Sequence, residues 1–444
     1  MATIAGTKSI RGLSIAQLKQ LPGNNRSNVP VHGMLHAVRD MGNFAFLILR
    51  KSDGLVQCVY NKTGTEEEKE LLREESAVLI TADVVEEPRA VNGIELRVKE
   101  LEQLSAPKKE LPFCVSKRGL NIALENEISV RPAALRNQRK RSVFKLQEGL
   151  AQAFRQHLSQ KGFTEIFTPK IVSAGAEGGA NIFQMNYFGK KAYLAQSPQF
   201  YKQMLIPVYE RVFEIAPVFR AEKHDTPRHL NEYISVDFEM GFIDSFADIM
   251  ETEAGMLRFA FAHLKQHYAQ YLEALQVTLP EIGEIPRIRF TEAKERVAER
   301  YNHKIRDPYD LEPEEERLIG RLALEEYGSE FVFVTHYPVK KRPFYAMDDP
   351  EDPRYTLSFD LLFRGLEVTT GGQRIHDYDA QVEKMRSKGL DPEDFETYLM
   401  LHLYGCPPHG GLGMGLERLL QKLLEESNIR ATSMFPRDTT RLNP

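Results

Sequence analysis

Cationic and imidazole side chains are concentrated in one short segment near the middle of the chain, residues 220–229. The segment holds Arg220, Glu222, Lys223, His224, Arg228 and His229. Apolar, β-branched and aromatic runs at 212–219 and 233–238 flank it, which predicts a polar loop between two buried strands. Guanidinium groups bind phosphate oxygens through two parallel hydrogen bonds, so this composition favours a polyphosphate ligand. A solvated loop is the alternative for a charge cluster taken alone.

Carboxylates in an apolar setting form a second candidate site. Asp360 and Glu367 lie in an otherwise apolar run, and Thr370 follows. Unpaired carboxylates inside a sheet are costly, so they need a cation. On one continuous strand, residues seven apart face opposite sides, and Gly365 would permit the bend or bulge that brings them together. An ion-pair network that includes Arg364 is the alternative to a ligand site.

Three further stretches could contact a ligand. Gly178 and Gly179 permit a loop that closes over a ligand, and Glu177 beside them could hold an ammonium group. Lys202, in the stretch AQSPQFYKQ, could hold a carboxylate. Near the C-terminus, the glycines of HGGLGMG predict a strand that turns sharply into a helix, with Arg418 on its first turns. The positive end of a helix favours phosphate, although glycine-rich turns are common and the signal is weak alone.

Composition bounds the class of protein. The chain has 444 residues, 42% of them hydrophobic and 27% charged, which predicts a soluble globular protein with one large and one smaller domain. No apolar run approaches the ~18 residues of a membrane span and no apolar signal core is present, so we expect a cytoplasmic protein without membrane contact. Cys58, Cys114 and Cys406 are far apart, which argues against a disulfide framework and a zinc site. A net charge of −5 means that a nucleic acid would have to bind local basic patches.

Periodicity divides the chain into four parts. Residues 1–28 are polar and predict a short appendage. Five β-type runs between residues 29 and 104, with a helix at 66–75 between the third and fourth, predict a five-stranded OB barrel, a fold that binds oligonucleotides. Residues 105–130 contain prolines and lysines without an apolar pattern and predict a hinge. Residues 131–444 then form the larger domain.

The larger domain mixes strands and helices, and we expect the α+β class. Residues 243–330 are mostly helical in pattern, and we interpret them as scaffold without chemistry of their own. Residues 331–334 and 343–347 predict buried strands.

Three stretches of the chain, in this order, resemble the sequence motifs of the class II aminoacyl-tRNA synthetases. The segment that ends at Pro169 resembles motif 1, which forms the dimer interface in the family. Phe219-Arg220-Ala221-Glu222 opens a segment that resembles motif 2, and Gly413-Met414-Gly415-Leu416-Glu417-Arg418 resembles motif 3. The resemblance covers nearly the whole chain from about Val29. It implies an N-terminal OB barrel followed by an antiparallel sheet flanked by helices, in a homodimer.

The resemblance also implies a nucleotide site. Arg220 and Arg418 match the catalytic arginines: Arg220 would neutralise the α-phosphate of ATP, and Arg418 and His229 would hold the outer phosphates. Tyr233 and Arg418 would enclose the adenine, and Glu222 would contact its amino edge. The full set implied for ATP is Arg220, Glu222, Arg228, His229, Tyr233, Glu367 and Arg418.

A metal ion and an amino acid are implied as well. Glu367 and Thr370 match the pair that holds catalytic Mg²⁺, and Asp360 matches a carboxylate that helps to hold the metal and ATP. Threonine departs from the usual serine here but keeps the oxygen ligand. The loops between the motifs resemble those of aspartyl-tRNA synthetases, whose L-aspartate site corresponds here to Glu177, Gln199, Lys202 and Arg374.

Two of these residues bear on the choice of amino acid. Lys202 and Arg374 both suit a carboxylate, and an amide there would leave two buried cations poorly paired, which favours aspartate over asparagine. The resemblance thus implies ATP-dependent attachment of aspartate to tRNA through an aspartyl-adenylate. An asparaginyl-tRNA synthetase, which does not keep this lysine pattern, and a non-catalytic tRNA-binding relative are the alternatives.

The predicted barrel resembles the anticodon-binding domain of the same family. Phe44 and Phe46 share one face of a strand. Composition alone favours Phe46 as a core residue, whereas the resemblance implies that Phe46 stacks on an anticodon base, that Gln57 hydrogen-bonds that base and that Arg39 is a further contact. Met34 stands where many discriminating aspartyl enzymes carry tryptophan. The implied partner is tRNA(Asp), and Met34 favours slightly that tRNA(Asn) is charged too.

Overall fold

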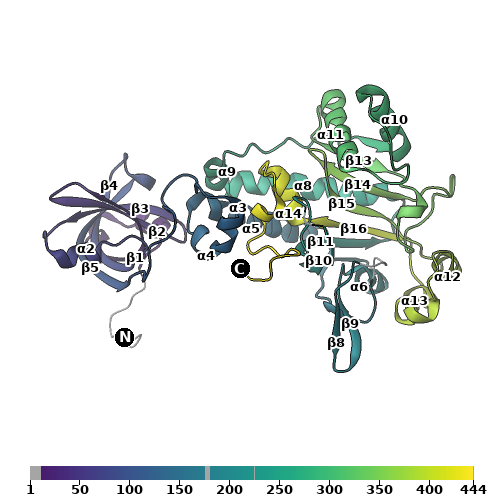
Figure 1. Cartoon of the computed structure of the whole chain (residues 1–444), viewed down its shortest axis with the longest axis horizontal. Coiled ribbons are helices and arrows are strands. Elements are labelled where there is room, and N and C mark those ends of the chain that lie inside the picture. Colours follow the sequence, from purple (N-terminus) through teal and green to yellow (C-terminus); the bar gives the residue numbers. More distant parts are fainter. Residues whose placement is uncertain (1–11, 176–180, 225, 444) are drawn as a thin grey trace. The chain divides into compact units, whose positions relative to one another are not determined.

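The computed structural model describes three segments of the chain, 12–175, 181–224 and 226–443. Its two compact units are Met1–Ile122 with Arg136–Gln138, and Ala123–Leu135 with Arg139–Pro444 (Figure 1). The division at Ile122 falls inside the stretch for which the sequence predicts a hinge. Helix α3 (Leu124–Ser129), also inside that stretch, belongs to the larger unit.

The smaller unit is a closed barrel of five strands in the order β1-β2-β3-β5-β4. The strands are β1 (Val29–Asp40), β2 (Phe44–Lys51), β3 (Gly54–Asn61), β4 (Ala77–Glu86) and β5 (Ile94–Ser105). Neighbouring strands are antiparallel except β3 and β5, which are parallel. Helix α2 (Glu66–Leu71) connects β3 to β4. The predicted OB barrel is therefore confirmed, and its helix ends at Leu71 rather than at residue 75.

Part of the predicted N-terminal appendage packs against the barrel. Helix α1 (Ile15–Lys19) begins with a capping box between Ser14 and Gln17. Its Ile15 and Leu18 are buried in the same apolar cluster as the inward side chains of the strands. The polar composition of the first residues hides these two apolar anchors, which are spaced three apart as on one helix face.

The larger unit is built on an eight-stranded sheet in the order β12-β13-β14-β15-β16-β11-β10-β6. Its strands are β6 (Thr164–Glu165), β10 (Arg211–Phe219), β11 (Glu232–Gly241), β12 (Arg287–Arg289), β13 (Phe331–Thr335), β14 (Ser358–Phe363), β15 (Leu366–Gln373) and β16 (His409–Gly415). The inner pairs are antiparallel, and only the two edge strands, β6 and β12, run parallel to their neighbours. The predicted antiparallel sheet in an α+β chain is confirmed.

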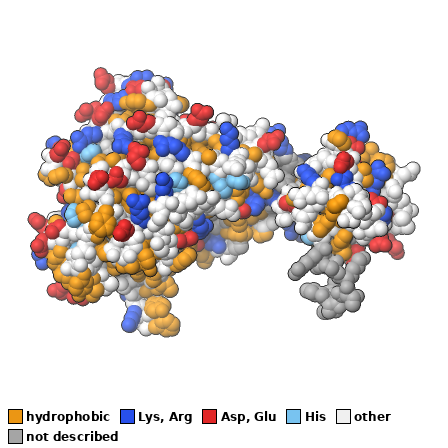
Figure 2. Space-filling model, turned by 180° about the vertical axis from the view of Figure 1, so that it is seen from behind, with side chains coloured by type: hydrophobic (Ala, Val, Ile, Leu, Met, Phe, Trp, Pro, Cys, Tyr) orange, Lys and Arg blue, Asp and Glu red, His pale blue; other side chains and the backbone are white. Residues whose placement is uncertain are grey.

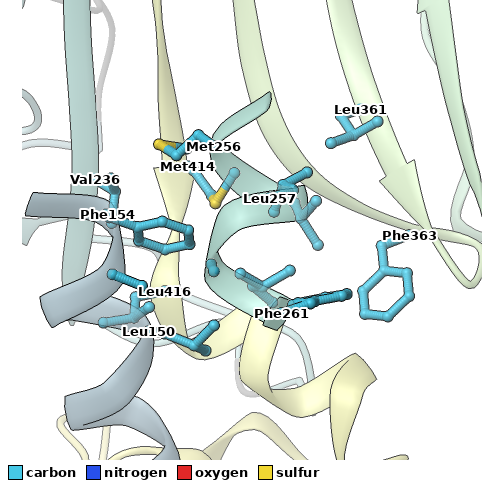
Figure 3. Packing of buried hydrophobic residues seen from close by; sticks show 14 of the residues in the cluster. Leu150, Phe154, Val236, Met256, Leu257, Phe261, Leu361, Phe363, Met414 and Leu416 are labelled. Atoms are coloured by element: carbon cyan, nitrogen blue, oxygen red, sulfur yellow. The ribbon is translucent and has the colours of Figure 1, made fainter. Parts of the chain in front are cut away.

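Helices flank the sheet (Figure 1). They include α5 (Gln138–Gln160), α6 (Gln199–Met204), α8 (Ala247–His267), α10 (Phe290–Tyr301), α11 (Pro313–Tyr327), α12 (Tyr378–Ser387), α13 (Glu396–Leu403) and α14 (Leu416–Leu423). Figure 3 shows side chains of α5, α8 and the sheet filling one space, with Phe154, Leu257 and Phe363 among them. Burial of these large apolar side chains supplies most of the driving force that holds helices and sheet together. The helical pattern predicted for 243–330 is confirmed.

The run from Asp360 to Thr370 is a hairpin and not one bent strand. Arg364 and Gly365 both have positive φ, 47° and 69°, which is the geometry of a tight turn between antiparallel strands. Asp360 therefore lies directly opposite Thr370. Across the strands, residue 361 pairs with 369 and 362 pairs with 367, so Val368 is the extra residue of a bulge.

The segment 343–347 was expected to be a strand, and this expectation is wrong. Its backbone turns, with the amide of Ala346 donating to the carbonyl of Pro343, and only an isolated bridge joins Ala346 to Arg374. Proline has no amide hydrogen to give to a sheet, which favours the turn.

The distribution of charge on the surface and the lengths of the helices agree with the expectations from composition. Figure 2 shows basic and acidic side chains interspersed over the presented face of each unit, so no large field of one sign dominates there. Within the described residues, every helix falls short of the length or apolar content that crossing a membrane requires.

Candidate active site

A cleft over the centre of the larger sheet collects most of the side chains singled out by the sequence. One part, a pocket of about 580 Å³, is lined by Arg220, Glu222, Arg228, His229, Tyr233, Glu367, Thr370 and Arg418, among others. A second part of about 1230 Å³ shares Arg220, Tyr233, Glu367 and Thr370 with the first and adds Gln199, Asp360 and Arg374. Strands β11, β14, β15 and β16 supply much of these walls, and the loop after β10 supplies Arg220, so segments far apart in the sequence meet at one place.

Backbone hydrogen bonds fix the start of the arginine-rich loop. Strand β10 ends at Phe219, and the amide of Arg220 donates to the carbonyl of Asn231 across the loop at 2.9 Å. The Asn231 side chain in turn donates to the carbonyls of Arg220, at 2.7 Å, and Glu222, at 3.0 Å. The Arg220 guanidinium lies 5.9 Å from the ring centre of Tyr233. The loop is thus held where its cations face the cleft.

Arg228 is positioned by a residue that the sequence left unassigned. Its Nη2 donates to both carboxylate oxygens of Glu316 on α11, at 2.6 and 2.5 Å. Glu316 also accepts the backbone amide of Glu367 at 2.8 Å. Burial, followed by the nearby charge of Glu367, raises the pKa of Glu316. The region 243–330, which we interpreted as scaffold, therefore contributes a residue that holds Arg228 and Glu367 in place. Helical periodicity alone does not indicate this role.

Glu367 lies at the junction of several arginines. Arg418, on the first turn of α14, donates from Nη1 to the Glu367 carbonyl at 3.0 Å and to its carboxylate at 3.2 Å. Burial acts to raise the pKa of Glu367, but Arg418, Arg342, Arg220 and Arg228 outweigh it, and the net shift is downward. Glu367 is therefore an anion at neutral pH.

Asp360 is paired with a buried arginine that sequence reasoning missed. Arg342 lies with Nη2 2.8 Å from the Asp360 carboxylate and with its guanidinium 3.9 Å from the ring centre of Tyr337. Burial raises the pKa of Asp360 to about 6, with Arg342 opposing the rise and Glu367 adding to it. Nothing in the local pattern distinguishes Arg342 from the adjacent lysines.

The bulge at Val368 explains how the acidic oxygens meet. Residues 367 and 370 would face opposite sides of a regular strand, and the extra residue brings both to one side, where Thr370 Oγ1 donates to Glu367 at 3.4 Å. Asp360, directly across from Thr370, faces the same way. Two carboxylates and a hydroxyl are the hard oxygen ligands that Mg²⁺ prefers, so the residues fit the implied ion.

The floor of the cleft is a buried group of two cations and two carboxylates. Lys202 on α6 donates to Asp237 at 2.9 Å and to the Leu412 carbonyl at 2.8 Å, and lies 3.4 Å from Glu239. Arg374 donates from Nε to Glu239 at 2.9 Å. Burial acts to raise the pKa of Glu239, but Arg374 and Lys202 outweigh it and lower the pKa.

This group corrects the charge argument for aspartate. Lys202 and Arg374 were expected to be poorly paired unless a substrate carboxylate is present, but Asp237 and Glu239 already pair with them. Lys202 has 1% of its surface exposed and lies beneath the cleft, whereas Arg374 lines it. The two carboxylates sit two apart on β11, where residues of alternating number share a face, and this spacing was the signal in the sequence.

Two other predicted amino-acid contacts have different outcomes. Gln199 is buried, lines the cleft and donates to the Gln203 side chain at 3.0 Å. Glu177 lies outside the described residues.

On the barrel, the four predicted anticodon residues share one outer face. Phe46 pairs across the strands with Arg39, and Gln57 pairs with the residue two positions along from Phe46. Met34 is further along the same face. Phe46 is half-buried outside the barrel core and meets Phe44 edge-on, with ring centres 5.4 Å apart. The interpretation of Phe46 as a core residue is therefore wrong.

Pro169 follows edge strand β6 and is exposed. Phe167, two residues earlier, leaves 85% of its surface exposed. A large apolar side chain exposed at a sheet edge is typical of a surface that binds another protein chain.

An OB barrel followed by an antiparallel sheet with an arginine-lined cleft is the architecture of a class II aminoacyl-tRNA synthetase. The family comparisons agree: residues 124–439 match the class II tRNA synthetases (D, K and N), and residues 29–104 match the OB-fold nucleic acid binding domain. The chain belongs to the class II tRNA synthetases of the D, K and N group.

Individual relatives are similar over nearly the full length. The chain is 44% identical to an aspartate--tRNA(Asp/Asn) ligase of Deinococcus radiodurans, covering 96% of this chain and 98% of the relative. It is 38% identical to an aspartate--tRNA(Asp) ligase of Pyrococcus abyssi, covering 95% and 97%. Among solved structures, the asparaginyl-tRNA synthetase of Pyrococcus horikoshii with asparaginyl-adenylate has a TM-score of 0.86 at 32% identity, covering 96% of this chain and 99% of that one.

Proposed function

We propose that the protein attaches L-aspartate to tRNA(Asp) in an ATP-dependent reaction that passes through an aspartyl-adenylate. The observation that carries the proposal is the continuity of the cleft: the arginine-lined pocket opens into a second part that contains Arg374 and has Lys202 in its floor. Such a cleft suits a nucleotide at one end and a small acidic amino acid at the other. The relatives at 38–44% identity whose names specify aspartate support the same assignment.

The chemistry is an in-line attack of the aspartate α-carboxylate on the α-phosphorus of ATP, with pyrophosphate as the leaving group. The protein needs no nucleophile of its own, because positioning and charge stabilisation suffice. We assign Arg220 to the α-phosphate, where negative charge accumulates as phosphorus becomes five-coordinate. The terminal ribose hydroxyl of the tRNA then attacks the aspartyl carbonyl and releases AMP.

The remaining arginine-pocket residues bind and orient ATP. Arg418 and His229 would hold the outer phosphates, with Arg228 beside them. Burial is the main cause that lowers the pKa of His229, so its imidazole is neutral near pH 7 and serves as a hydrogen-bond donor rather than as a charge. Tyr233 and Arg418 line one pocket, and we place the adenine between them. Mg²⁺ held by Glu367, Thr370 and Asp360 would neutralise phosphate charge.

Arg374 is the cation that meets the substrate side chain in this proposal. It lines the cleft while Glu239 holds its Nε, so the guanidinium is oriented before aspartate binds. Lys202 holds Asp237 and Glu239 in place beneath it. Asparagine lacks the charge that Arg374 favours, and exchange of ATP and pyrophosphate with each amino acid tests the preference. Exchange that depends on asparagine and not on aspartate would support an asparaginyl enzyme instead.

We further propose that tRNA(Asn) is charged as well as tRNA(Asp). Met34 lies on the barrel face with Phe46 and Gln57, and methionine offers less contact area to the third anticodon base than an indole would. Charging of both tRNA transcripts with labelled aspartate tests the proposal. Product with tRNA(Asp) alone would show that another residue reads the third base.

Two assembly-level proposals accompany this function. The exposed Phe167 and Pro169 beside edge strand β6 support a homodimer, and light scattering coupled to size-exclusion chromatography tests it.

A cytoplasmic location is the setting in which tRNA, ATP and aspartate are all available, and cell fractionation tests it.

A further inference from the structure

A group of metal-ligating side chains lies outside the active-site cleft, between the end of α10 and the start of α11. We call it the α11 cluster: His303, Glu312 and Glu315. One ligand atom from each residue lies within 4.8 Å of the other two. The chain leaves α10 at Tyr301 and returns at Glu312, which is the N-cap of α11, so a loop brings the histidine to the first helical turn.

Two atoms of the cluster are buried without a hydrogen-bond partner among the described residues. They are Oε1 of Glu315 and Nε2 of His303. Glu315 is fully buried, and the two atoms are 3.7 Å apart, which is too long for a hydrogen bond. A buried carboxylate oxygen that points at an imidazole nitrogen without bonding it needs an explanation, and a bound ion is one.

Hydrogen bonds to neighbouring groups fix the geometry of the cluster. Oε2 of Glu315 accepts from Lys294 Nζ at 2.6 Å and from the Glu312 amide at 2.9 Å. The Glu312 side chain accepts the amide of Glu315 in a capping box. Of the two carboxylate oxygens of Glu315, Oε1 therefore remains for a ligand, and it lies 3.7 Å from Nε2 of His303.

The charge of the cluster also favours a cation. Glu312 and Glu315 contribute two negative charges, and Lys294 offsets one of them. An imidazole nitrogen with two carboxylates is a ligand set of divalent transition metals, with bonds of about 2.0–2.2 Å that place tetrahedral ligands about 3.4 Å apart. The 3.7 Å separation of Glu315 and His303 is close to that spacing.

We propose that His303, Glu312 and Glu315 form a binding site for a divalent transition-metal ion such as Zn²⁺, with water completing the coordination. The cysteine count argues against a cysteine-ligated zinc site but does not bear on this ligand set. His303 and Glu312 also line a surface cavity of about 1400 Å³, which gives an ion a path from solvent.

The site would act on the cleft through one turn of helix. Glu316 follows Glu315 directly, and its carboxylate holds Arg228 and the backbone amide of Glu367. An ion on Glu315 would fix the first turn of α11, and with it the orientation of Glu316. His303, Glu312 and Glu315 are thus positioning residues in this proposal.

The test is Zn²⁺ binding by tag-free protein that has been stripped with a chelator and dialysed against a buffered zinc series, with bound metal measured by mass spectrometry. We expect a site whose occupancy falls at least about tenfold in His303→Ala and in Glu312→Gln. Glutamine keeps an oxygen acceptor for the helix cap, so Glu312→Gln should fold. Glu314→Gln, the same change on an exposed carboxylate of the same turn that pairs with Arg317, is the matched control and should bind normally.

Binding must also be separated from the active site and from other histidines. Glu367→Gln removes an active-site carboxylate and should leave the zinc site intact, and so should His267→Ala, which breaks a histidine pair on α8. Saturating Zn²⁺ should raise the Tm of the parent protein by about 3 °C and leave that of His303→Ala unchanged. Zinc binding that survives His303→Ala, that is lost only with Glu367→Gln or His267→Ala, or that is absent altogether would overturn the proposal and leave His303 and Glu315 as a simple ion pair.

Discussion

Glu253 on α8 predicts a specific dependence of stability on pH. The side chain is fully buried behind the sheet, and burial, with a smaller contribution from the charge of Asp360, raises its pKa from 4.5 to about 8. The folded protein therefore holds this proton more tightly than the unfolded chain does. Its contribution to the free energy of unfolding is complete below pH 4.5 and is lost progressively as the pH rises to about 8.

The pKa values determine the size of the effect. The interval between 4.5 and about 8 corresponds to a loss of about 5 kcal/mol in total. Between pH 5.5 and pH 8.5 the same relation assigns a loss of about 3 kcal/mol to this one group. Glu253→Gln keeps the shape and cannot ionise, so the difference in unfolding free energy between variant and parent should move by about 3 kcal/mol in favour of the variant over that range.

Guanidinium unfolding at several pH values measures this difference. The chain has no tryptophan, so circular dichroism is the suitable signal, and the larger unit holds most of the helices. Glu251→Gln, two residues away on α8 and largely exposed, is the control and should follow the parent curve. Parallel curves for Glu253→Gln and the parent protein would refute the reasoning, because they would show that Glu253 is ionised or absent from the pH response.

Three further predictions concern the reaction. Arg220→Ala should lower the rate of aspartate-dependent ATP–pyrophosphate exchange by about a hundred- to thousandfold, and retained exchange would remove Arg220 from the α-phosphate. Phe46→Ala should lower kcat/KM for tRNA charging by about five- to a hundredfold through lost stacking and leave exchange unchanged; a parallel fall in exchange would contradict a role confined to the anticodon. Lys202→Gln leaves Asp237 and Glu239 with an excess of negative charge, so ATP–pyrophosphate exchange with aspartate should fall more than exchange with asparagine. A thermal melt should show a loss of about 3–5 kcal/mol in stability. An unchanged ratio of the two exchange rates would show that Lys202 does not contribute to selectivity.

The local sequence pattern was sufficient to predict the elements whose structure is determined by neighbouring residues. Alternation of apolar residues predicts the five barrel strands, and the glycine-rich stretch before Arg418 predicts the turn from β16 into α14. The hairpin at Gly365 was missed, because one glycine permits a bulge or a turn equally well, and the choice depends on which partner strand the chain meets. Proline at 343 was the available sign that the following residues turn.

The parts of the site that escaped prediction are those in which one side chain acts on another. Four such residues hold side chains that the motifs do identify: Arg342, Asp237, Glu239 and Glu316. Each of the four lies in a segment whose sequence pattern is that of an ordinary strand, loop or helix. A buried charge must have a partner, so every predicted cation in the cleft implies a carboxylate, but sequence order does not say which one. The charge argument for Lys202 and Arg374 was wrong for this reason. The two cations alone predict a site that binds a substrate carboxylate, whereas the group of two cations and two carboxylates has balanced charge. In the proposed function, selectivity for aspartate therefore depends on how Glu239 orients Arg374 and not on an excess of positive charge.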